Sequence, residues 1–151
     1  TLEKIVRVFT QQANRKKLKI TIEDGFDELP KASGKIANLE QIFFILIENA
    51  IQAADISRRS ELRIDGEVKN GCVILSFEDN CGGIDQEHLE KIFEPFFSTK
   101  SSQEGTGLGL CILKRILDNY GGKVNVENHE GKGVSFFVLL RINDRNVVDL
   151  S

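Results

Sequence analysis

Asn49 and Asp79 are polar side chains in apolar surroundings, where each needs a hydrogen-bonding or metal partner. Asn49 lies in LEQIFFILIENAIQAA. A buried amide without a partner costs about 1–3 kcal/mol, and its carbonyl oxygen is a ligand type that magnesium accepts. Asp79 begins Asp-Asn-Cys-Gly-Gly-Ile directly after an alternating apolar segment. A carboxylate there accepts a hydrogen bond from an exocyclic amine, and the glycines let a flat ring approach the backbone. Taken singly, an amide bonded to a neighbouring loop and an ordinary turn explain the two patterns as well.

A glycine-rich segment, Gly105-Thr106-Gly107-Leu108-Gly109-Leu110, precedes an amphipathic stretch from Cys111 to Asn119. Backbone amides in such a loop, together with the positive end of a following helix, suit phosphate groups. The spacing is not that of a P-loop, because no Gly-Lys-Ser/Thr follows, and no strand leads into it as a dinucleotide fold requires. By itself the pattern fits a flexible surface loop equally well.

The segment IFEPFFSTK, residues 92–100, places three phenylalanines beside a proline and ends in Lys100. Exposed aromatic rings in such number anchor a lid or dock a partner, whereas other rings pack in the core, and we expect core packing for at least one of them. Lys100 is able to reach a terminal phosphate as a point charge.

The elements that position these residues follow from the apolar spacing. Helical spacing predicts helices over residues 1–14, 38–54, 86–92 and 107–119. Asn38 is the predicted N-cap of the second helix, and Gly121 or Gly122 ends the last. Alternation predicts strands over residues 18–23, 62–68, 72–78, 123–127 and 134–142. Asn70-Gly71 predicts a tight hairpin turn, and a mobile loop is expected over residues 98–106.

This order predicts an α+β fold with two layers, in which helices cover one face of an antiparallel or mixed sheet. We expect one domain over residues 1–151, because the length suits a single core and 40% of the residues are hydrophobic. The net charge of −3 without a basic block argues against a nucleic-acid or membrane surface. Three cysteines without paired spacing favour a reducing, cytoplasmic setting over disulfides or zinc. The absence of methionine suggests a segment of a longer protein.

In this order, over residues 37–140, the motifs resemble the catalytic domain of sensor histidine kinases, in the ATPase family shared with gyrase, Hsp90 and mismatch-repair ATPases. IENAIQAA looks like the N-box and DNCGGI like the first glycine box. IFEPFFSTK looks like the F-box, and GTGLGLCILKRI like the second glycine box. The F-box with Ser-Thr-Lys is found in the kinase branch. The fold implied is a mixed, mostly antiparallel sheet with helices on one face (Bergerat-type).

The resemblance implies roles for individual residues. Asn49 would bind the Mg²⁺ that bridges the triphosphate of ATP, and Lys100 would lie near the phosphates, so these two are the candidate catalytic residues. Asp79 would accept from the adenine amino group, and Ser135 matches the hydroxyl that supports Asp79 and the adenine through water. The other residues implied to bind ATP are Gln52, Ala53, Gly83, Ile84, Phe93, Gly105, Thr106, Gly107, Leu108, Gly109 and Leu110.

Two positions depart from the family pattern. Ile45 stands where hydrolytic relatives carry a water-activating glutamate and many kinases carry a second asparagine. An aliphatic side chain can neither accept a proton from water nor bind a metal ion. Glu48 is expected to point about 100° around the helix from Asn49, so it is not expected to substitute. Cys81 stands where the first glycine of its box usually lies.

The activity implied is transfer of the ATP γ-phosphoryl group to a histidine on a separate or missing dimerisation domain, for relay to a response regulator. His88 and His129 are expected at the surface, and neither lies in an acceptor pattern. The domain is expected to be monomeric and inactive without the acceptor domain. The full protein is expected to be a homodimer. Membrane anchorage of the full protein, outside this domain, is consistent with the resemblance. The alternatives are a nucleotide-sensing module without transfer, for which Ile45 argues, and a serine-directed anti-sigma-type kinase, which the F-box disfavours.

Overall fold

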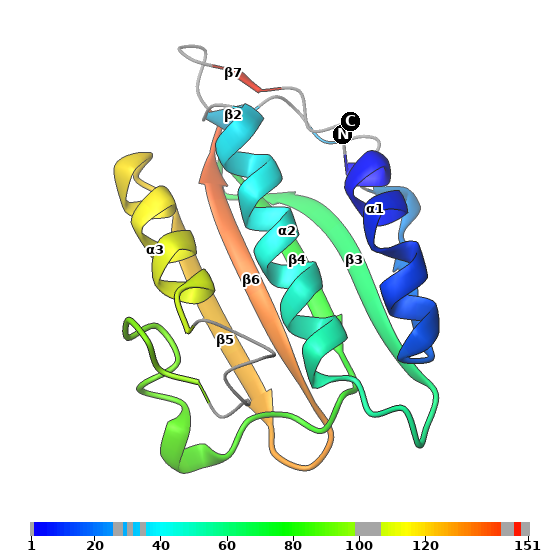
Figure 1. The fold of residues 1–151 in the computed structure, drawn as a ribbon. Helices are drawn as coiled ribbons and strands as arrows, with labels where there is room; N and C mark the ends of the chain where they lie inside the picture. Colours follow the sequence, from blue (N-terminus) through cyan, green and yellow to red (C-terminus); the bar gives the residue numbers. More distant parts are fainter. Residues whose placement is uncertain are drawn as a thin grey trace.

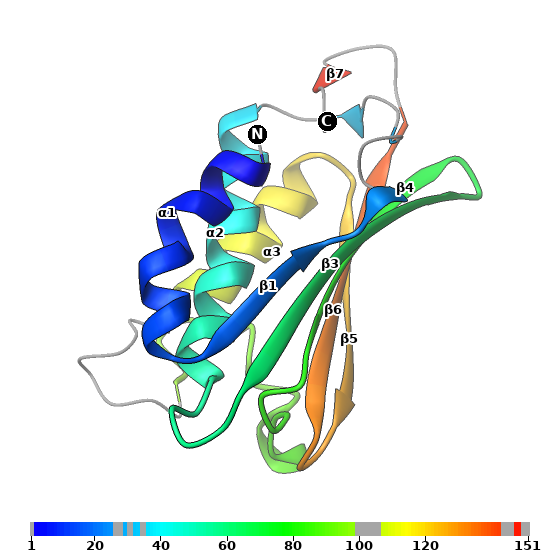
Figure 2. The ribbon, with the colours of Figure 1, turned by 90° about the vertical axis from the view of Figure 1, so that its right-hand side faces the viewer.

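Three helices cover one face of a five-stranded sheet in the described part of the computed structural model (Figures 1 and 2). The structure describes residues 2–25, 29, 32–33, 36–98, 107–142 and 147–148. The view along the sheet edge places all three helices on one side, while no described helix covers the other face (Figure 2). The predicted α+β architecture is therefore observed.

Helix α2, Ile36–Ala53, lies centrally on the sheet between α1, Leu2–Arg15, and α3, Gly109–Asn119 (Figure 1). Apolar residues at helical spacing turn inward from α2, among them Ile42, Phe43, Leu46, Ile47 and Ala50. Because this helix is apolar over most of its circumference, it is buried by the sheet beneath it and by a helix on each flank. It is the element on which Asn49 is carried.

The main sheet has the order β1-β3-β4-β6-β5 and is mixed, since β1 pairs parallel with β3 and all other pairs are antiparallel. Its strands are β1 Leu18–Ile22, β3 Ser60–Lys69, β4 Cys72–Asp79, β5 Lys123–His129 and β6 Gly133–Arg141. Alternate residues on β4 and β6 are buried against the helices, as the period of two requires. Two short strands, β2 Ala32–Ser33 and β7 Val147–Val148, pair separately.

The hairpin between β3 and β4 is confirmed, because Asn70 and Gly71 both adopt positive φ, at 52° and 72°. Asn38 is not an N-cap: α2 begins at Ile36, so Asn38 lies inside the helix and its amide donates to the hydroxyl of Tyr120 at 2.7 Å. The helix predicted over 86–92 is only a 3₁₀ turn, Gln86–His88. The loop expected over 98–106 falls, apart from its first residue, outside the described residues.

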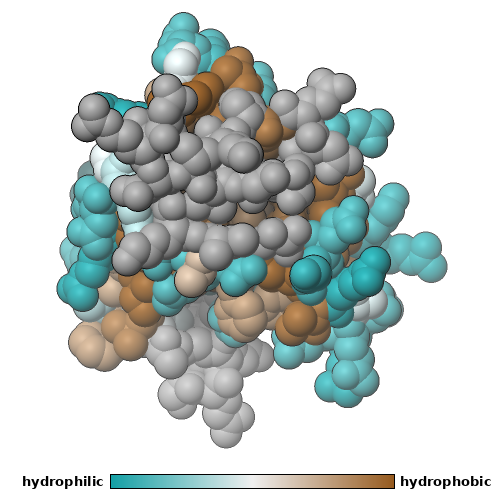
Figure 3. All heavy atoms as spheres, turned by 90° about the horizontal axis from the view of Figure 1, so that it is seen from above, coloured by the Kyte–Doolittle hydropathy of each residue, from teal (hydrophilic) through white to brown (hydrophobic). Residues whose placement is uncertain are grey.

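The view from above shows hydrophilic side chains projecting at the margins of the described surface, with smaller hydrophobic areas between them (Figure 3). Within the described ranges, no helix is long and apolar enough to cross a bilayer.

The turn between β5 and β6 is held tightly against the residues that follow β4. Gly82 donates its N–H to the carbonyl of Lys132 at 2.9 Å. Asn128 bonds both backbone groups of Ile84, accepting its N–H at 2.8 Å and donating to its carbonyl at 2.7 Å. A Cβ placed on Gly133 would lie 1.9 Å from the carbonyl oxygen of Asp79. The end of β4 is thus positioned by the absence of a side chain at residue 133.

We predict that Gly133→Ala lowers the free energy of unfolding by about 3 kcal/mol, because the new methyl group overlaps backbone that cannot move without breaking the β4–β6 pairing. The control is Gly131→Ala, where φ is 78° but nothing lies within 4 Å, so only backbone strain of about 1 kcal/mol is expected. Urea unfolding of the two variants compares them. Equal destabilisation would contradict the close contact.

Candidate nucleotide-binding site

A cavity of about 390 Å³ opens between α2, the end of β4 and the start of α3, a volume within the range of small-molecule sites. Its wall includes apolar side chains from α2 and the sheet, such as Ile45, Leu62 and Phe77. Nine residues proposed from the sequence as ligand contacts line it: Asn49, Gln52, Ala53, Asp79, Gly83, Ile84, Gly107, Gly109 and Leu110. Segments distant in the sequence therefore meet at one site.

Asp79 is the last residue of β4 and lines the cavity. The backbone N–H of Cys81 donates to its Oδ1 at 2.9 Å, which fixes the orientation of the carboxylate. An ionised carboxylate has about four lone-pair sites on its two oxygens, so it accepts several donors at once. Gly83, with φ of 75°, brings the chain past this carboxylate so closely to the carbonyl of His129 that a Cβ would lie only 2.6 Å from it.

Asn49 faces the cavity from α2 and is half-buried, between the buried residues Ile47 and Ala50. Ile45, one turn earlier, also lines the cavity and contacts the start of α3, since a Cβ on Gly109 would lie 3.3 Å from its Cγ2. The position four residues before Asn49 is thus filled by an aliphatic group that packs against the neighbouring helix.

The first residues of α3 complete the cavity on the side opposite Asp79. Gly109 and Leu110 line it, so the N-terminus of this 11-residue helix faces the open volume. Gly107, with φ of 70°, precedes it, and its carbonyl accepts the N–H of Phe96 at 2.9 Å. The amides of a first helical turn and the positive end of the helix dipole make this side favourable for an anion.

A polar acceptor at one end of an apolar cavity and a helix N-terminus at the other suit a ligand with a polar ring and anionic groups. Residues 34–144 match the family of histidine kinase-, DNA gyrase B- and HSP90-like ATPases. The chain belongs to this family.

Relatives in the family are sensor kinases. The chain is 33% identical over 138 residues to the sensor histidine kinase ZraS of Escherichia coli K12, which covers 91% of this chain and 29% of ZraS. It is 41% identical over 106 residues to the signal transduction histidine-protein kinase AtoS of the same organism, covering 70% of this chain and 17% of AtoS. The chain thus spans less than a third of the length of these relatives.

The fold matches solved structures of the same group. The nucleotide-free catalytic domain of histidine kinase ThkA superposes with a TM-score of 0.77 at 28% identity, covering 93% of this chain and 89% of that one. The resemblance to the histidine kinase catalytic domain, drawn from the four boxes, is confirmed. The ATPase family implies that the domain binds ATP.

Ser135 does not line this cavity but borders a second hollow that Asp79 also lines, so the role suggested for it, support of Asp79 through water, stays a prediction. Side chains alternate along β6: Val134, opposite Asp79, and Phe136 face the cavity, whereas Ser135 pairs with Glu78 and lines a second hollow on the other face of the sheet. Two other residues predicted to bind ATP, Phe93 and Leu108, are not among the described residues that line the cavity. Lys100, Gly105 and Thr106 lie outside the described residues.

Glu48 lines the cavity as well as Asn49. The cavity therefore extends around α2 far enough to include two residues that lie about 100° apart on the helix. Glu48 therefore adds a carboxylate beside Asn49.

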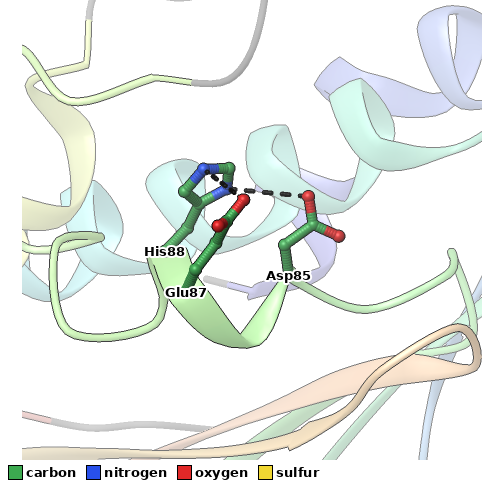
Figure 4. A group of neighbouring side chains, drawn as sticks. All are labelled: Asp85, Glu87 and His88. Atoms are coloured by element: carbon green, nitrogen blue, oxygen red, sulfur yellow. Dashed lines mark ion pairs between the residues drawn. The ribbon is translucent and has the colours of Figure 1, made fainter.

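His88 also borders the cavity, although the sequence suggested a surface position. Its ring packs on Phe97 with centroids 5.5 Å apart. The carboxylates of Asp85 and Glu87 approach its two ring nitrogens at 3.7 and 3.5 Å, and the three side chains project to the same side of the 3₁₀ turn (Figure 4). Among the described lining residues it is the only side chain able to carry a positive charge. The signal for it was the spacing of three between Asp85 and His88, which one turn of helix brings together.

Cys81 lines the cavity next to Asp79, and its thiol donates to the carbonyl oxygen of Ala50 at 3.8 Å. Burial and, second, the negative charge of Asp79 raise the pKa of the thiol to about 11. The side chain is therefore a neutral thiol at physiological pH, and it forms part of the wall.

We predict that Asp79→Asn weakens adenine nucleotide binding by about 10- to 100-fold while the fold stays intact. The variant amide places an N–H₂ group where the carboxylate accepts from the N–H of Cys81 and from the amino group of the base. A hydrogen bond to a charged group contributes about 1.5–3 kcal/mol, which corresponds to this loss of affinity. Glu78→Gln, the same type of change one residue earlier on the opposite sheet face, is the control and should leave the affinity unchanged. Calorimetric titration with ADP measures both, and an unaltered affinity in Asp79→Asn would refute the pocket assignment.

Proposed function

We propose that this chain is the ATP-binding catalytic domain of a two-component sensor histidine kinase, which transfers the γ-phosphoryl group of ATP to a histidine of a dimerisation domain. The observation that carries the proposal is the convergence of Asp79, Asn49 and the N-terminus of α3 on one cavity. The naming of the relatives as sensor histidine kinases supports the protein substrate.

In the proposed complex, Asp79 accepts a hydrogen bond from the 6-amino group of adenine while Gly83 allows the ring to lie against the backbone. The phosphates extend toward Gly107, Gly109 and the start of α3, with Lys100, Gly105 and Thr106 supplying further contacts. Positioning and charge neutralisation then account for catalysis, since phosphoryl transfer needs little covalent participation by the protein. The acceptor imidazole nitrogen forms the new N–P bond as the bond from phosphorus to the ADP oxygen breaks, and the imidazole proton passes to a base of the acceptor domain.

Asn49 is the residue proposed to hold Mg²⁺. Asn49 and Glu48 both line the cavity, and together they offer amide and carboxylate oxygens. Such hard-oxygen ligands fit a cation that usually takes one or two protein ligands with phosphate oxygens and water. When bound, the cation supplies charge neutralisation at the phosphates. Asn49 itself would orient the triphosphate relative to the base held by Asp79.

Ile45 directs the proposed reaction away from hydrolysis. An aliphatic residue buried against Gly109 cannot activate water, so the γ-phosphoryl group is retained for the protein acceptor. A nucleotide-sensing module without transfer is the alternative that this residue also fits, but the kinase relatives favour transfer.

The partners follow from the same proposal. The domain, itself monomeric, docks with the dimerisation domain of a homodimeric protein, and the phosphoryl group passes from the histidine to an aspartate of a response regulator. A cytoplasmic location agrees with three free cysteines in the described chain.

We predict that mixing this domain with the histidine-containing hairpin of its own full-length protein, ATP and Mg²⁺ produces acid-labile phosphate on the hairpin. Asn49→Ala should lower the yield at least about tenfold, because the cation at the phosphates loses its protein ligand. Asn119→Ala, at the exposed end of α3, is the matched control and should retain full transfer. Labelled ATP and acid treatment of the product make the measurement. Nucleotide binding without any phosphohistidine would favour the sensing module, and acid-stable phosphate would favour a serine-directed kinase.

A further inference from the structure

We propose that Cys81 sets the base specificity of the cavity, by closing the space beside Asp79 so that adenine nucleotides with a substituent on the 6-amino nitrogen are rejected. The inference rests on the proposed function, since it requires that Asp79 receives the 6-amino group. It assigns to one side chain a steric role that is separate from the hydrogen bond to the base.

The thiol of Cys81 spans the gap between the end of β4 and helix α2. The backbone N–H of Cys81 donates to Oδ1 of Asp79 at 2.9 Å, and Sγ lies 3.8 Å from the carbonyl oxygen of Ala50, the residue after Asn49. Both residues flanking this gap, Asp79 and Ala50, also line the cavity. A group attached to an amine that is bonded to Asp79 therefore meets the Cys81 side chain.

Hydrogen bonds and close contacts prevent the backbone next to Cys81 from moving away from the cavity. The N–H of the next residue, Gly82, is bonded to the carbonyl of Lys132, and Ile84 is held at both backbone groups by Asn128. Gly83 lies so close to the carbonyl of His129 that even a Cβ would stand 2.6 Å from it. The β5–β6 turn thus holds the loop in place, and the thiol is a fixed part of the wall.

The space behind the thiol is filled. Cys81 packs against the apolar core, and Ser60, which interacts with it, is only 4% exposed. A substituent cannot displace the sulfur inward without overpacking this region. A steric clash is an effective source of specificity because it weakens binding of the N6-substituted nucleotide and leaves the contacts of the unsubstituted nucleotide unchanged.

The backbone of Cys81 does not require a special residue type. The described non-glycine residues with positive φ are Lys17, Asn70 and Phe96, so Cys81 adopts an ordinary conformation that alanine, serine and glycine also accept. Removal of its side chain is therefore expected to open the cavity without rearranging the loop.

The test is calorimetric titration of ADP and N6-benzyl-ADP, each with Mg²⁺, into the wild-type domain and three variants. The wild type should bind ADP at least about tenfold more tightly than N6-benzyl-ADP. Cys81→Gly and Cys81→Ala should keep the affinity for ADP within about threefold and reduce that ratio at least about fivefold. Cys81→Ser, which restores a side chain of similar size and a donor to Ala50, should return the ratio to that of the wild type.

Cys111→Ser is the matched control, because Cys111 is also half-buried but bonds the carbonyl of Leu108 at 3.2 Å, on the phosphate side of the cavity. Its ratio should equal that of the wild type. Circular dichroism establishes that each variant is folded, and Cys81→Ala carries the test if Cys81→Gly does not fold. Equal affinity of the wild type for both nucleotides, or an unchanged ratio in folded Cys81→Gly and Cys81→Ala, overturns the steric role. Failure of the wild type to bind ADP is a separate result that overturns the proposed function itself.

Discussion

The close approach of the β5–β6 turn to the end of β4 is the constraint on which the site depends. The pairing of β4 with β6 ends where Gly133 passes the carbonyl of Asp79 without room for a side chain. Beyond that point the attachment continues through the bond from Gly82 to Lys132 in the turn and the bond from Ile84 to Asn128 at the end of β5. Because loop residues normally keep considerable conformational freedom, such fixing on both sides is what allows a loop to present a binding surface of defined shape.

Helix α2 meets a second demand, since it belongs both to the core and to the cavity. Ile42, Phe43 and Ile47 are buried almost completely, while Asn49 and Gln52 face the cavity near the end of the same helix. The position of Asn49 relative to Asp79 is therefore set by core packing, and the thiol of Cys81 joins the two elements at Ala50. The α3 N-terminus is placed through the contact of Gly109 with Ile45 on α2. The three parts of the site share one packed framework.

The sequence predicted the elements of this framework because their signals are local. Alternation in β4 and β6, the Asn-Gly turn and the apolar spacing of α2 each specify structure within a few residues, and Asp79 and Asn49 could be located on them. The sheet face on which Ser135 lies could not be read from the sequence, because a difference of one residue along a strand moves a side chain to the other face, and only the register of β6 against β4 decides it. His88 was expected at the surface rather than at the site because the width of the cavity depends on tertiary packing. Asn38 has typical N-cap chemistry, yet its bond to Tyr120 is a contact across 82 residues that no local pattern indicates.

In the proposed complex, one cavity holds the base at Asp79 and the phosphates at the start of α3. A crystal structure of the domain with Mg²⁺ and a non-hydrolysable ATP analogue would show both ends of the nucleotide at once. We expect the 6-amino nitrogen within hydrogen-bonding distance of the Asp79 carboxylate, the cation bound by the Asn49 amide oxygen, and the phosphates against the backbone of residues 107–110. A nucleotide bound elsewhere, or with its base directed toward α3 and its phosphates toward Asp79, would contradict it.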